Sequence, residues 1–150
     1  MGTRRSHVNI SLLLLLMFSI LVSNASSKWL NWVTVHVQND IEGHNVALDM
    51  HCRSNDDDLG QRTLHQGEEW HWDFRVAFPS THFWCDFRWY DNPDYRWYNG
   101  TFDVYRASLG KHKYKDFCAS NCPWSARRDG FYLYRRDRQE WQKRNEWHAE

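Results

Sequence analysis

Residues 69–78 read EWHWDFRVAF, in which every even position is apolar and residues 69, 71, 73 and 75 are polar. Successive side chains of a strand point to opposite faces of a sheet, so a period of two is typical of a strand with one buried face. The stretch predicts such a strand, with an inward-facing set made of Trp70, Trp72, Phe74, Val76 and Phe78.

The next run, residues 82–89 (HFWCDFRW), repeats this pattern in the odd register, and only Trp84 interrupts its polar face. Pro79-Ser80, between the two runs, predicts a turn. The run therefore predicts a second half-buried strand, with an inward face that carries Phe83, Cys85, Phe87 and Trp89.

Shorter stretches with the same alternation predict further strands, and dipeptides such as Asn99-Gly100 and Asp129-Gly130 predict turns between them. No window longer than one turn favours a helix. We therefore expect an all-β fold, a small disulfide-bonded antiparallel β-sandwich of about seven to eight strands, with a closed barrel as the alternative. The further strands are expected at 33–37, 46–52, 102–106, 124–127, 131–134 and 141–147.

The chain has 10 tryptophans, and their register separates core positions from surface positions. Trp70, Trp72 and Trp89 follow the apolar alternation, and we expect them in the core, because large aromatic residues fill a small sandwich efficiently. Trp84 and Trp97 fall on a polar register or in a loop. They are the candidates for an exposed aromatic contact.

Residues 1–27 have the features of a secretory signal peptide. The pair Arg4-Arg5 precedes an apolar run at residues 10–22, and small residues follow at 25–27. Because a spanning helix needs about 20 apolar residues, a membrane anchor is the weaker interpretation. We expect cleavage after residue 25 or 27 and an extracellular mature protein.

The charge balance favours neither nucleic acid nor lipid as a partner. The chain has 19 Lys+Arg and 19 Asp+Glu, and loss of Arg4 and Arg5 with the leader leaves 19 − 2 = 17 basic residues. Binding to nucleic acid or an anionic membrane calls for a basic excess that this composition lacks. Without a second apolar stretch, linker or repeat, we expect residues 28–150 to form one monomeric domain that does not insert into a membrane.

All four cysteines lie after the leader, and an even count in an oxidising compartment predicts two disulfides. Only three residues separate Cys118 from Cys122, so we expect each to bond to Cys52 or Cys85 rather than to the other. A bridge that closes several tens of residues would contribute about 4 kcal/mol. A Cys/His zinc site is the alternative, but the spacing of His51 and Cys52 matches no zinc pattern.

Residues 51–60, HCRSNDDDLG, place three consecutive aspartates behind a cysteine. They lack the ligand spacing of an EF-hand loop, and nothing indicates that one carboxyl is buried, as a catalytic pair would require. We interpret residues 54–58 as a solvated loop at the rim of the sheet, and we expect no catalytic residue, cofactor or metal. A hydrolase that uses a histidine with residues 56–58 is the weakest alternative.

Four histidines fall on the polar faces of predicted strands. Two imidazoles on neighbouring strands could bind a metal or titrate near pH 6, but sequence spacing does not establish that any two face each other. We favour scattered surface histidines as the interpretation of His36, His51, His71 and His82.

Asn99-Gly100-Thr101 is an N-glycosylation sequon at a predicted turn, where an acceptor side chain would be accessible. We expect Asn99 to carry a glycan.

Seven features occur in a fixed order along the chain: VTVHVQND (33–40), LDMHCRSNDDDLG (48–60), Gly67 with Trp70, FWCDFRW (83–89), FDVY (102–105), CASNCPWSARRDGFYLY (118–134) and EWQKRNEW (140–147). Together, behind a leader, they resemble the plant self-incompatibility S1 family, the S-protein homologues. The likeness covers about residues 32–147.

This resemblance implies a secreted, non-enzymatic protein that acts in cell-cell recognition by binding a cell-surface receptor protein. Ala126, where a larger aliphatic residue is expected, and residues 91–98 (DNPDYRWY) depart from the family pattern. Because exposed loops carry function on rigid scaffolds, we regard loops 91–98 and 135–140 as the candidate recognition sites. The candidate contact residues are Asp91, Asn92, Asp94, Tyr95, Arg96 and Trp97.

A second functional class is a lectin-like module that binds cell-wall glycans. In this alternative, Trp84, Trp97 and neighbouring aspartates would stack on sugar rings and hydrogen-bond to their hydroxyls.

Overall fold

A computed structural model of the chain describes residues 10, 11, 17, 32–107, 118 and 120–150. The chain divides into two compact units, Met1–Trp32 and Val33–Glu150, and the second contains the fold. Most of the expected leader lies outside the described residues, so its cleavage stays a prediction. Within the described residues, we find no helix with the length and apolar character that crossing a membrane requires.

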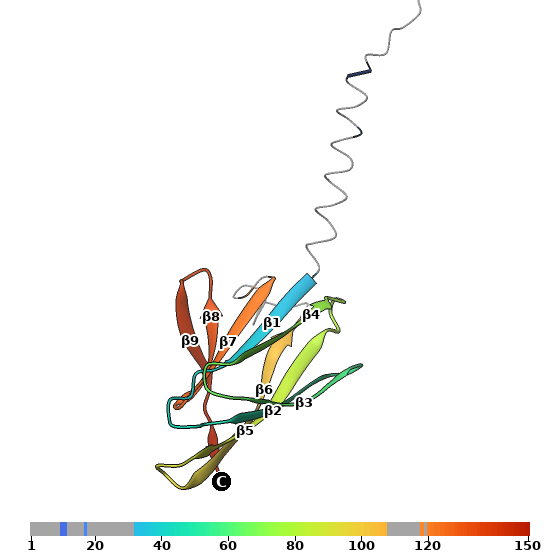
Figure 1. Cartoon of the computed structure of the whole chain (residues 1–150). Coiled ribbons are helices and arrows are strands. Elements are labelled where there is room, and N and C mark those ends of the chain that lie inside the picture. The colour runs from blue at the N-terminus through green and yellow to red at the C-terminus, as the bar shows by residue number, and fades with distance from the viewer. Residues whose placement is uncertain (1–9, 12–16, 18–31, 108–117, 119) are drawn as a thin grey trace, which may run out of the picture. The chain divides into compact units, whose positions relative to one another are not determined.

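The fold is all-β, as predicted, and its strands form two five-stranded sheets (Figure 1). The first sheet has the order β4-β1-β7-β8-β9, and the second has the order β10-β6-β5-β2-β3. The strands are β1 (Trp32–Asn39), β2 (Leu48–Ser54), β3 (Asp58–Leu64), β4 (Glu69–Arg75), β5 (His82–Asp91), β6 (Arg96–Arg106), β7 (Asn121–Arg127), β8 (Gly130–Arg135), β9 (Glu140–Asn145) and β10 (His148–Ala149).

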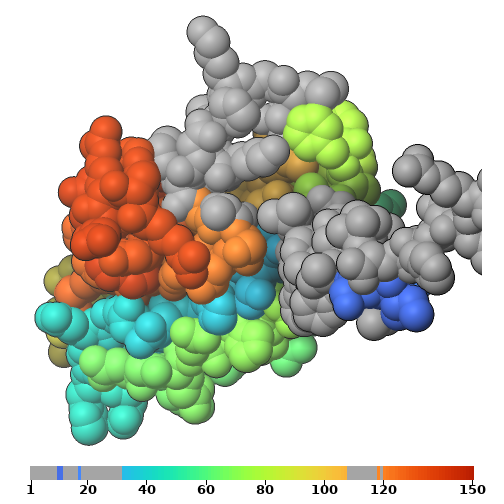
Figure 2. Space-filling model, turned by 90° about the horizontal axis from the view of Figure 1, so that it is seen from above, coloured from blue at the N-terminus to red at the C-terminus, as the bar shows by residue number. Residues whose placement is uncertain are grey.

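One pairing departs from the antiparallel sheet that we predicted. β1 and β7 run parallel, with Val35 opposite Cys122 and Val37 opposite Trp124. Parallel neighbours cannot be joined by a tight hairpin, and here β2, β3, β5 and β6 of the second sheet, together with β4, lie between them in the sequence. In the space-filling view, the orange surface of β7 adjoins the red surface of the C-terminal strands (Figure 2).

The period-two alternation places the core between the two sheets. β1 and β5 alternate between buried and partly exposed residues along most of their length. Trp72 and Trp89 are buried and Trp70 packs against the core, as predicted. The inward-facing side chains thus form one continuous apolar layer.

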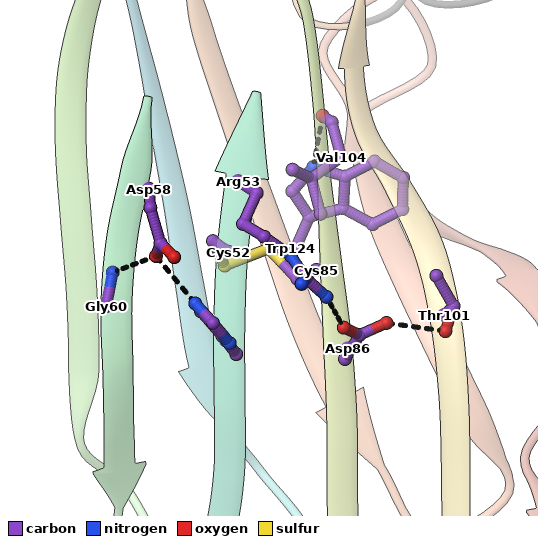
Figure 3. The surroundings of a disulfide bond; sticks show 10 residues. Cys52, Arg53, Asp58, Gly60, Cys85, Asp86, Thr101, Val104 and Trp124 are labelled. Carbon is purple, nitrogen blue, oxygen red and sulfur yellow. Dashed lines mark hydrogen bonds and ion pairs between the residues drawn. A yellow bond between two sulfur atoms is a disulfide. The ribbon is translucent and has the colours of Figure 1, made fainter. Parts of the chain in front are cut away.

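Phe131 of β8 lies at the centre of an aromatic cluster in this layer. Its ring stacks on Trp124 with centroids 4.8 Å apart, and it also contacts Phe87 and Phe102 of the second sheet. The Trp124 indole N–H donates to the carbonyl of Val104 over 3.0 Å, which connects the two sheets by a buried hydrogen bond (Figure 3).

The alternation pattern did not predict β3, because nearly every residue of this strand is exposed. The sequence DLGQRTL has little apolar periodicity and contains Gly60, with a φ of 77° that few residues other than glycine adopt. β3 pairs on one side with β2 and forms the edge of the second sheet. Pairing of backbone groups, rather than a buried face, defines it.

The predicted turn at Asn99-Gly100 is wrong, because both residues lie within β6, opposite Arg88 and Phe87 of β5. Gly100 is needed there for space and not for a turn. A Cβ on Gly100 would lie 2.1 Å from the Phe102 ring, which occupies the room that a side chain would take. The hairpin turn falls earlier, between the end of β5 and the start of β6.

Two predicted strands end earlier than the alternation implied. β4 stops at Arg75, and Phe78 is exposed rather than inward-facing, because the chain turns there ahead of Pro79. Near the C-terminus, β9 stops at Asn145 and the chain changes sheets. Trp147 packs against the core in this crossing, and its indole N–H donates to the Arg127 carbonyl over 2.6 Å.

The disulfide pairing differs from the one we expected. Cys52 bonds to Cys85, and Cys118 bonds to Cys122. Cys52 and Cys85 are directly opposite each other on β2 and β5 (Figure 3), both facing the core, so register brings them together. Sequence spacing alone does not contain that register.

The two disulfides should differ in their contribution to stability. The Cys52–Cys85 bridge spans 33 residues and the Cys118–Cys122 bridge spans 4. The chain-entropy relation gives about 4 kcal/mol for the longer loop and about 2 kcal/mol for the shorter one. Urea unfolding should therefore show the larger loss for Cys52→Ala/Cys85→Ala than for Cys118→Ala/Cys122→Ala. The reverse order would contradict this assignment.

Candidate recognition surface

The solvent-facing side of the second sheet carries two rows of polar side chains. In register across β3, β2, β5 and β6, one row contains Thr63, Asp49, Arg88 and Asn99, and the next contains Gln61, His51, Asp86 and Thr101. These eight residues alternate along each strand with residues that face the core. We call them the polar face.

Hydrogen bonds between neighbouring strands hold most of the polar face in place. The Thr63 hydroxyl donates to Asp49 over 2.6 Å, and the Thr101 hydroxyl donates to Asp86 over 2.6 Å. Asp86 also accepts from Arg53, which lies beside the Cys52–Cys85 bridge (Figure 3). A shallow hollow of about 580 Å³ lies over the polar face. It offers fixed donors and acceptors, as recognition of a polar partner requires.

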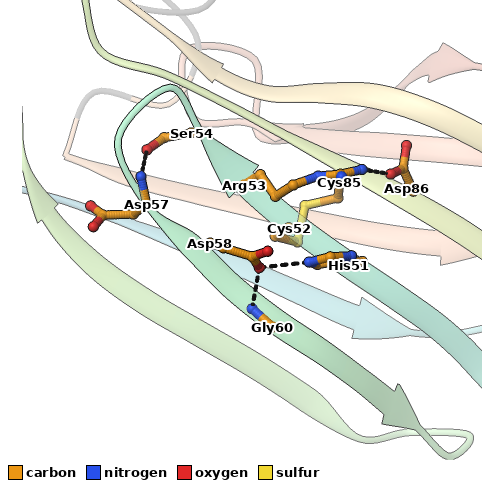
Figure 4. A network of polar contacts seen from close by, with 9 residues as sticks. All are labelled: His51, Cys52, Arg53, Ser54, Asp57, Asp58, Gly60, Cys85 and Asp86. Carbon is orange, nitrogen blue, oxygen red and sulfur yellow. Dashed lines mark hydrogen bonds and ion pairs between the residues drawn. A yellow bond between two sulfur atoms is a disulfide. The ribbon is translucent and has the colours of Figure 1, made fainter.

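The acidic segment beside this face is organised as a turn followed by a strand. The Ser54 hydroxyl accepts from the amides of Asp56 and Asp57, at 3.2 and 2.9 Å. Asp58 accepts from the Gly60 amide over 2.8 Å and contacts the His51 ring nitrogen over 2.6 Å (Figure 4). The interpretation of residues 54–58 as an exposed loop holds for residues 55–57, because Ser54 ends β2 and Asp58 begins β3.

These contacts give the histidine and aspartate a structural role. The hydrogen bond to His51, followed by that from Gly60, holds the pKa of Asp58 below its ordinary value. A lowered pKa favours the charged carboxylate, which is suited to accepting hydrogen bonds and unsuited to a general acid. The Ser54 hydroxyl is engaged with backbone amides rather than with the imidazole. The hydrolase alternative therefore gains no support from this arrangement.

The C-terminal residue borders the hollow and connects β5 to β6. Glu150 accepts from Arg88 over 2.8 Å and from the Asn99 side chain over 2.6 Å, and its amide donates to the Trp97 carbonyl over 2.9 Å. The contact with Arg88, and then that with Asn99, lowers the pKa of the Glu150 side chain. Sequence reasoning missed Arg88 and Glu150, because 62 residues separate them.

The β5–β6 hairpin places the candidate loop at the end of the same sheet, beside the C-terminus (Figure 1). Residues 92–97, which we call the hairpin tip, are all exposed. Tyr95 is 85% exposed and has a φ of 51°. Trp97 is 37% exposed and is held by the Arg88 guanidinium, 4.1 Å from its ring, and by the Tyr90 ring. Tyr95 and Trp97 are therefore two exposed aromatic side chains at the end of the sheet that carries the polar face.

Asp91, which we included among the contact residues, instead lies in the interior. It is 1% exposed and pairs with Arg128, which also donates to the Glu42 carbonyl over 3.1 Å. Arg128 follows β7 and thereby ties the first sheet to the base of the hairpin. Asp91 supports the hairpin tip from below and cannot reach a partner directly.

The other sequence candidates are separate from the hairpin tip. Trp84 is half-buried on the outer side of β5 and packs against the His82 ring, with centroids 5.1 Å apart. In the second loop, Arg135 is buried and pairs with Asp137, whereas residues 136–139, between β8 and β9 of the first sheet, are exposed. The two candidate loops thus belong to different sheets.

Asn99 lies in a strand rather than in the turn that we expected, and its side-chain nitrogen is hydrogen-bonded to Glu150. Its glycosylation stays a prediction, and a glycan there would compete with that contact and cover part of the hollow.

Comparison with known proteins identifies the family. A family model described as plant self-incompatibility protein S1 matches residues 34–147, which include most of β1, all of β2 to β9 and the hairpin tip. The chain belongs to the plant self-incompatibility S1 family. The polar face and hairpin tip are therefore surfaces of an S1 domain, and the family is one of self-incompatibility proteins rather than of enzymes.

Individual relatives show how far the S1 likeness extends. The chain is 40% identical to S-protein homolog 2 of Arabidopsis thaliana over 102 residues, which is 65% of this chain and 56% of the relative. It is also 40% identical to S-protein homolog 24 of the same plant over 104 residues, 69% of this chain and 61% of the relative. Self-incompatibility protein S1 of Papaver rhoeas is 30% identical over 118 residues, 78% of each chain. The chain thus spans less than two thirds of the length of the first two relatives.

Removal of Arg128 should destabilise the S1 domain by leaving the buried Asp91 carboxylate unpaired. Loss of one partner of a fully buried pair costs about 3–5 kcal/mol, and the partial exposure of Arg128 reduces this to about 2–4 kcal/mol. We expect that loss for Arg128→Met in urea unfolding, and less than about 1 kcal/mol for Arg138→Met, whose pair with Glu140 is exposed. Equal losses of unfolding free energy in the two variants would show that the Asp91–Arg128 pair stabilises the domain no more than an exposed pair does.

The Glu150 contacts should be visible in its titration. Because its folded-state pKa is lowered, the interaction stabilises the fold above the ordinary glutamate pKa and is lost as pH falls through the folded value. Arg88→Ala should raise the Glu150 pKa, measured by NMR of the side-chain carboxyl carbon. Arg62→Ala, which borders the same hollow, should leave it unchanged. An unaltered pKa in Arg88→Ala would refute the contact.

Proposed function

We propose that this S1 domain is secreted and acts as an extracellular ligand that binds a cell-surface receptor protein in cell-cell recognition. The hairpin tip makes the central contact, and the polar face makes the surrounding polar contacts. Family membership supports the recognition role, since the relatives include a protein named self-incompatibility protein S1. The receptor and the secreted location are part of the proposal.

The observation that carries this proposal is the presentation of Tyr95 and Trp97. Both are exposed aromatic residues, and tyrosine, tryptophan and arginine are the residue types most enriched where binding energy concentrates. Arg88 lies against Trp97 at the margin of the hollow. A partner bound at the hairpin tip would thus also contact the polar residues beside it. Protein interfaces commonly have this arrangement of an aromatic-rich centre and a polar rim.

The backbone conformation of the hairpin tip also supports the proposal. Tyr95 adopts a left-handed conformation, which costs a residue with a Cβ about 1–2 kcal/mol. Strained conformations of this kind cluster at functional sites. A glycine would fit the turn better, so stability does not explain why a large aromatic residue stands there.

Replacement of Tyr95 by glycine should separate stability from binding. We expect Tyr95→Gly to retain or raise the unfolding free energy, by up to about 1 kcal/mol, because relief of the backbone strain is partly offset by the greater conformational freedom that glycine loses on folding. Binding to plant cell-surface membranes should weaken by about tenfold or more, because a central aromatic contact is lost. Unfolding is measured in urea and binding by saturation with labelled protein.

Two matched variants serve as controls. Gln139 has a φ of 55° in the β8–β9 turn, so Gln139→Gly gives the same backbone relief in the other candidate loop. Trp97→Ala, which removes the other exposed aromatic side chain of the tip, should also weaken binding. Its control is Phe78→Ala, because Phe78 is an exposed aromatic residue distant in sequence from the tip. Weakened binding in either control, with unchanged binding in Tyr95→Gly and Trp97→Ala, would reject the assignment to the tip.

The same assay distinguishes a protein receptor from a glycan. Binding that protease treatment of the membranes abolishes supports the receptor proposal. Binding that resists protease, is blocked by soluble cell-wall glycans and depends on Trp97 would instead support the lectin-like alternative.

A further inference from the structure

The outer side of the first sheet brings together two histidines and a glutamate. His36 of β1 projects from the polar side of its strand, and Glu69 and His71 occupy alternate positions on the same side of β4. β1 and β4 are neighbours in the sheet, and the cyan surface of β1 borders the green surface of β4 in Figure 2. The three side chains therefore meet on one face.

The distances between their ligand atoms are short. His36 Nδ1 lies 2.7 Å from Glu69 Oε1, and His71 Nδ1 lies 3.8 Å from the same oxygen. The two imidazole rings have centroids 5.2 Å apart. One potential ligand atom from each residue falls within 4.8 Å of the other two. His36 is partly buried, whereas Glu69 and His71 are exposed, so the cluster is open to solvent.

Imidazole nitrogens and carboxylate oxygens are the ligand set of divalent transition metals such as Zn²⁺. Two histidines with one glutamate, plus a water molecule in an open position, form a known type of zinc coordination. Metal–ligand bonds of about 2.0–2.2 Å in a tetrahedron place ligand atoms about 3.3 Å apart. The observed 2.7 and 3.8 Å separations lie on either side of that value, so small rotations of exposed side chains would suffice.

Other histidines in the described part of the chain provide a contrast. His51 contacts Asp58 and His82 contacts Asp103, each through one imidazole and one carboxylate. Within the described residues, only the cluster on β1 and β4 combines three potential ligands at this spacing. A simple ion pair would need one histidine, and the second imidazole distinguishes this cluster.

We propose that His36, Glu69 and His71 form a surface site for a divalent transition metal of the Zn²⁺ class. The three side chains supply three ligands from two neighbouring strands, and solvent or a group from another molecule completes the coordination. The site lies on the first sheet, whereas the polar face and hairpin tip belong to the second. The proposal is therefore independent of the receptor-binding proposal.

The test is titration of the disulfide-intact protein, purified without a histidine tag, with ZnCl₂ by isothermal calorimetry. We expect saturable binding that His71→Ala weakens by at least about tenfold, since loss of a ligand should cost no less than loss of its supporting contacts. His71 is exposed, so this variant should fold. His36→Gln, which can still hydrogen-bond to Glu69, and Glu69→Gln should weaken binding similarly.

His51→Ala is the matched control, because it removes a carboxylate-paired imidazole from the other sheet. It should leave the affinity unchanged. As a readout at the site itself, Co²⁺ binding should produce the absorption bands of a low-symmetry site in the native protein and in His51→Ala, but not in His71→Ala. Absence of saturable binding, or equal losses in His71→Ala and His51→Ala, would overturn the proposal.

Discussion

Burial of aromatic side chains between the two sheets is the interaction on which the rest of the structure depends. Phe131 is fully buried and contacts rings from both sheets. Trp147 contributes to the same cluster just before the chain joins the second sheet as β10. Because one face of each central strand is committed to this layer, the alternate side chains must face solvent. The polar face is thus a geometric consequence of the core.

The same constraint explains how the recognition surface is supported. Trp89 faces the core from β5, and its ring stacks on Tyr98 of β6 at 4.8 Å, just beyond the hairpin tip. Asp91 and Arg128 then join the base of the hairpin to the first sheet. A tip anchored at both ends can present Tyr95 in a left-handed conformation without losing its position. Anchoring of this kind reduces the ordering cost that a flexible loop would incur on binding.

Sequence periodicity predicted the parts of the fold that have one buried face. It found β1, β2, β4 and β5 and the core positions of Trp72 and Trp89, since burial imposes alternation on those strands. It missed β3, where all residues except Leu59 and Leu64 are exposed, and it misread Asn99-Gly100, where glycine provides room for Phe102. In both places the local composition is typical of a turn. Only the pairing with a neighbouring strand shows that these residues belong to a strand.

Features that depend on register were the least predictable. The Cys52–Cys85 bridge joins residues that lie opposite each other on paired strands, and the expectation drawn from the Cys118–Cys122 spacing was therefore wrong. Asp91 resembled a loop residue by composition but is buried, and Arg88 and Glu150 meet although 62 residues separate them. The exposure of residues 92–97 followed from their turn-forming composition alone.

Site-specific photo-cross-linking would test the central claim, that the hairpin tip contacts a receptor protein, most directly. A photoreactive amino acid is placed at Tyr95 in one protein and at Arg138, in the other candidate loop, in a second. Each is irradiated on plant cell-surface membranes with and without excess unlabelled protein. We predict a protease-sensitive adduct at position 95 that the competitor removes, and none at position 138. A competable adduct at position 138 alone would contradict the account.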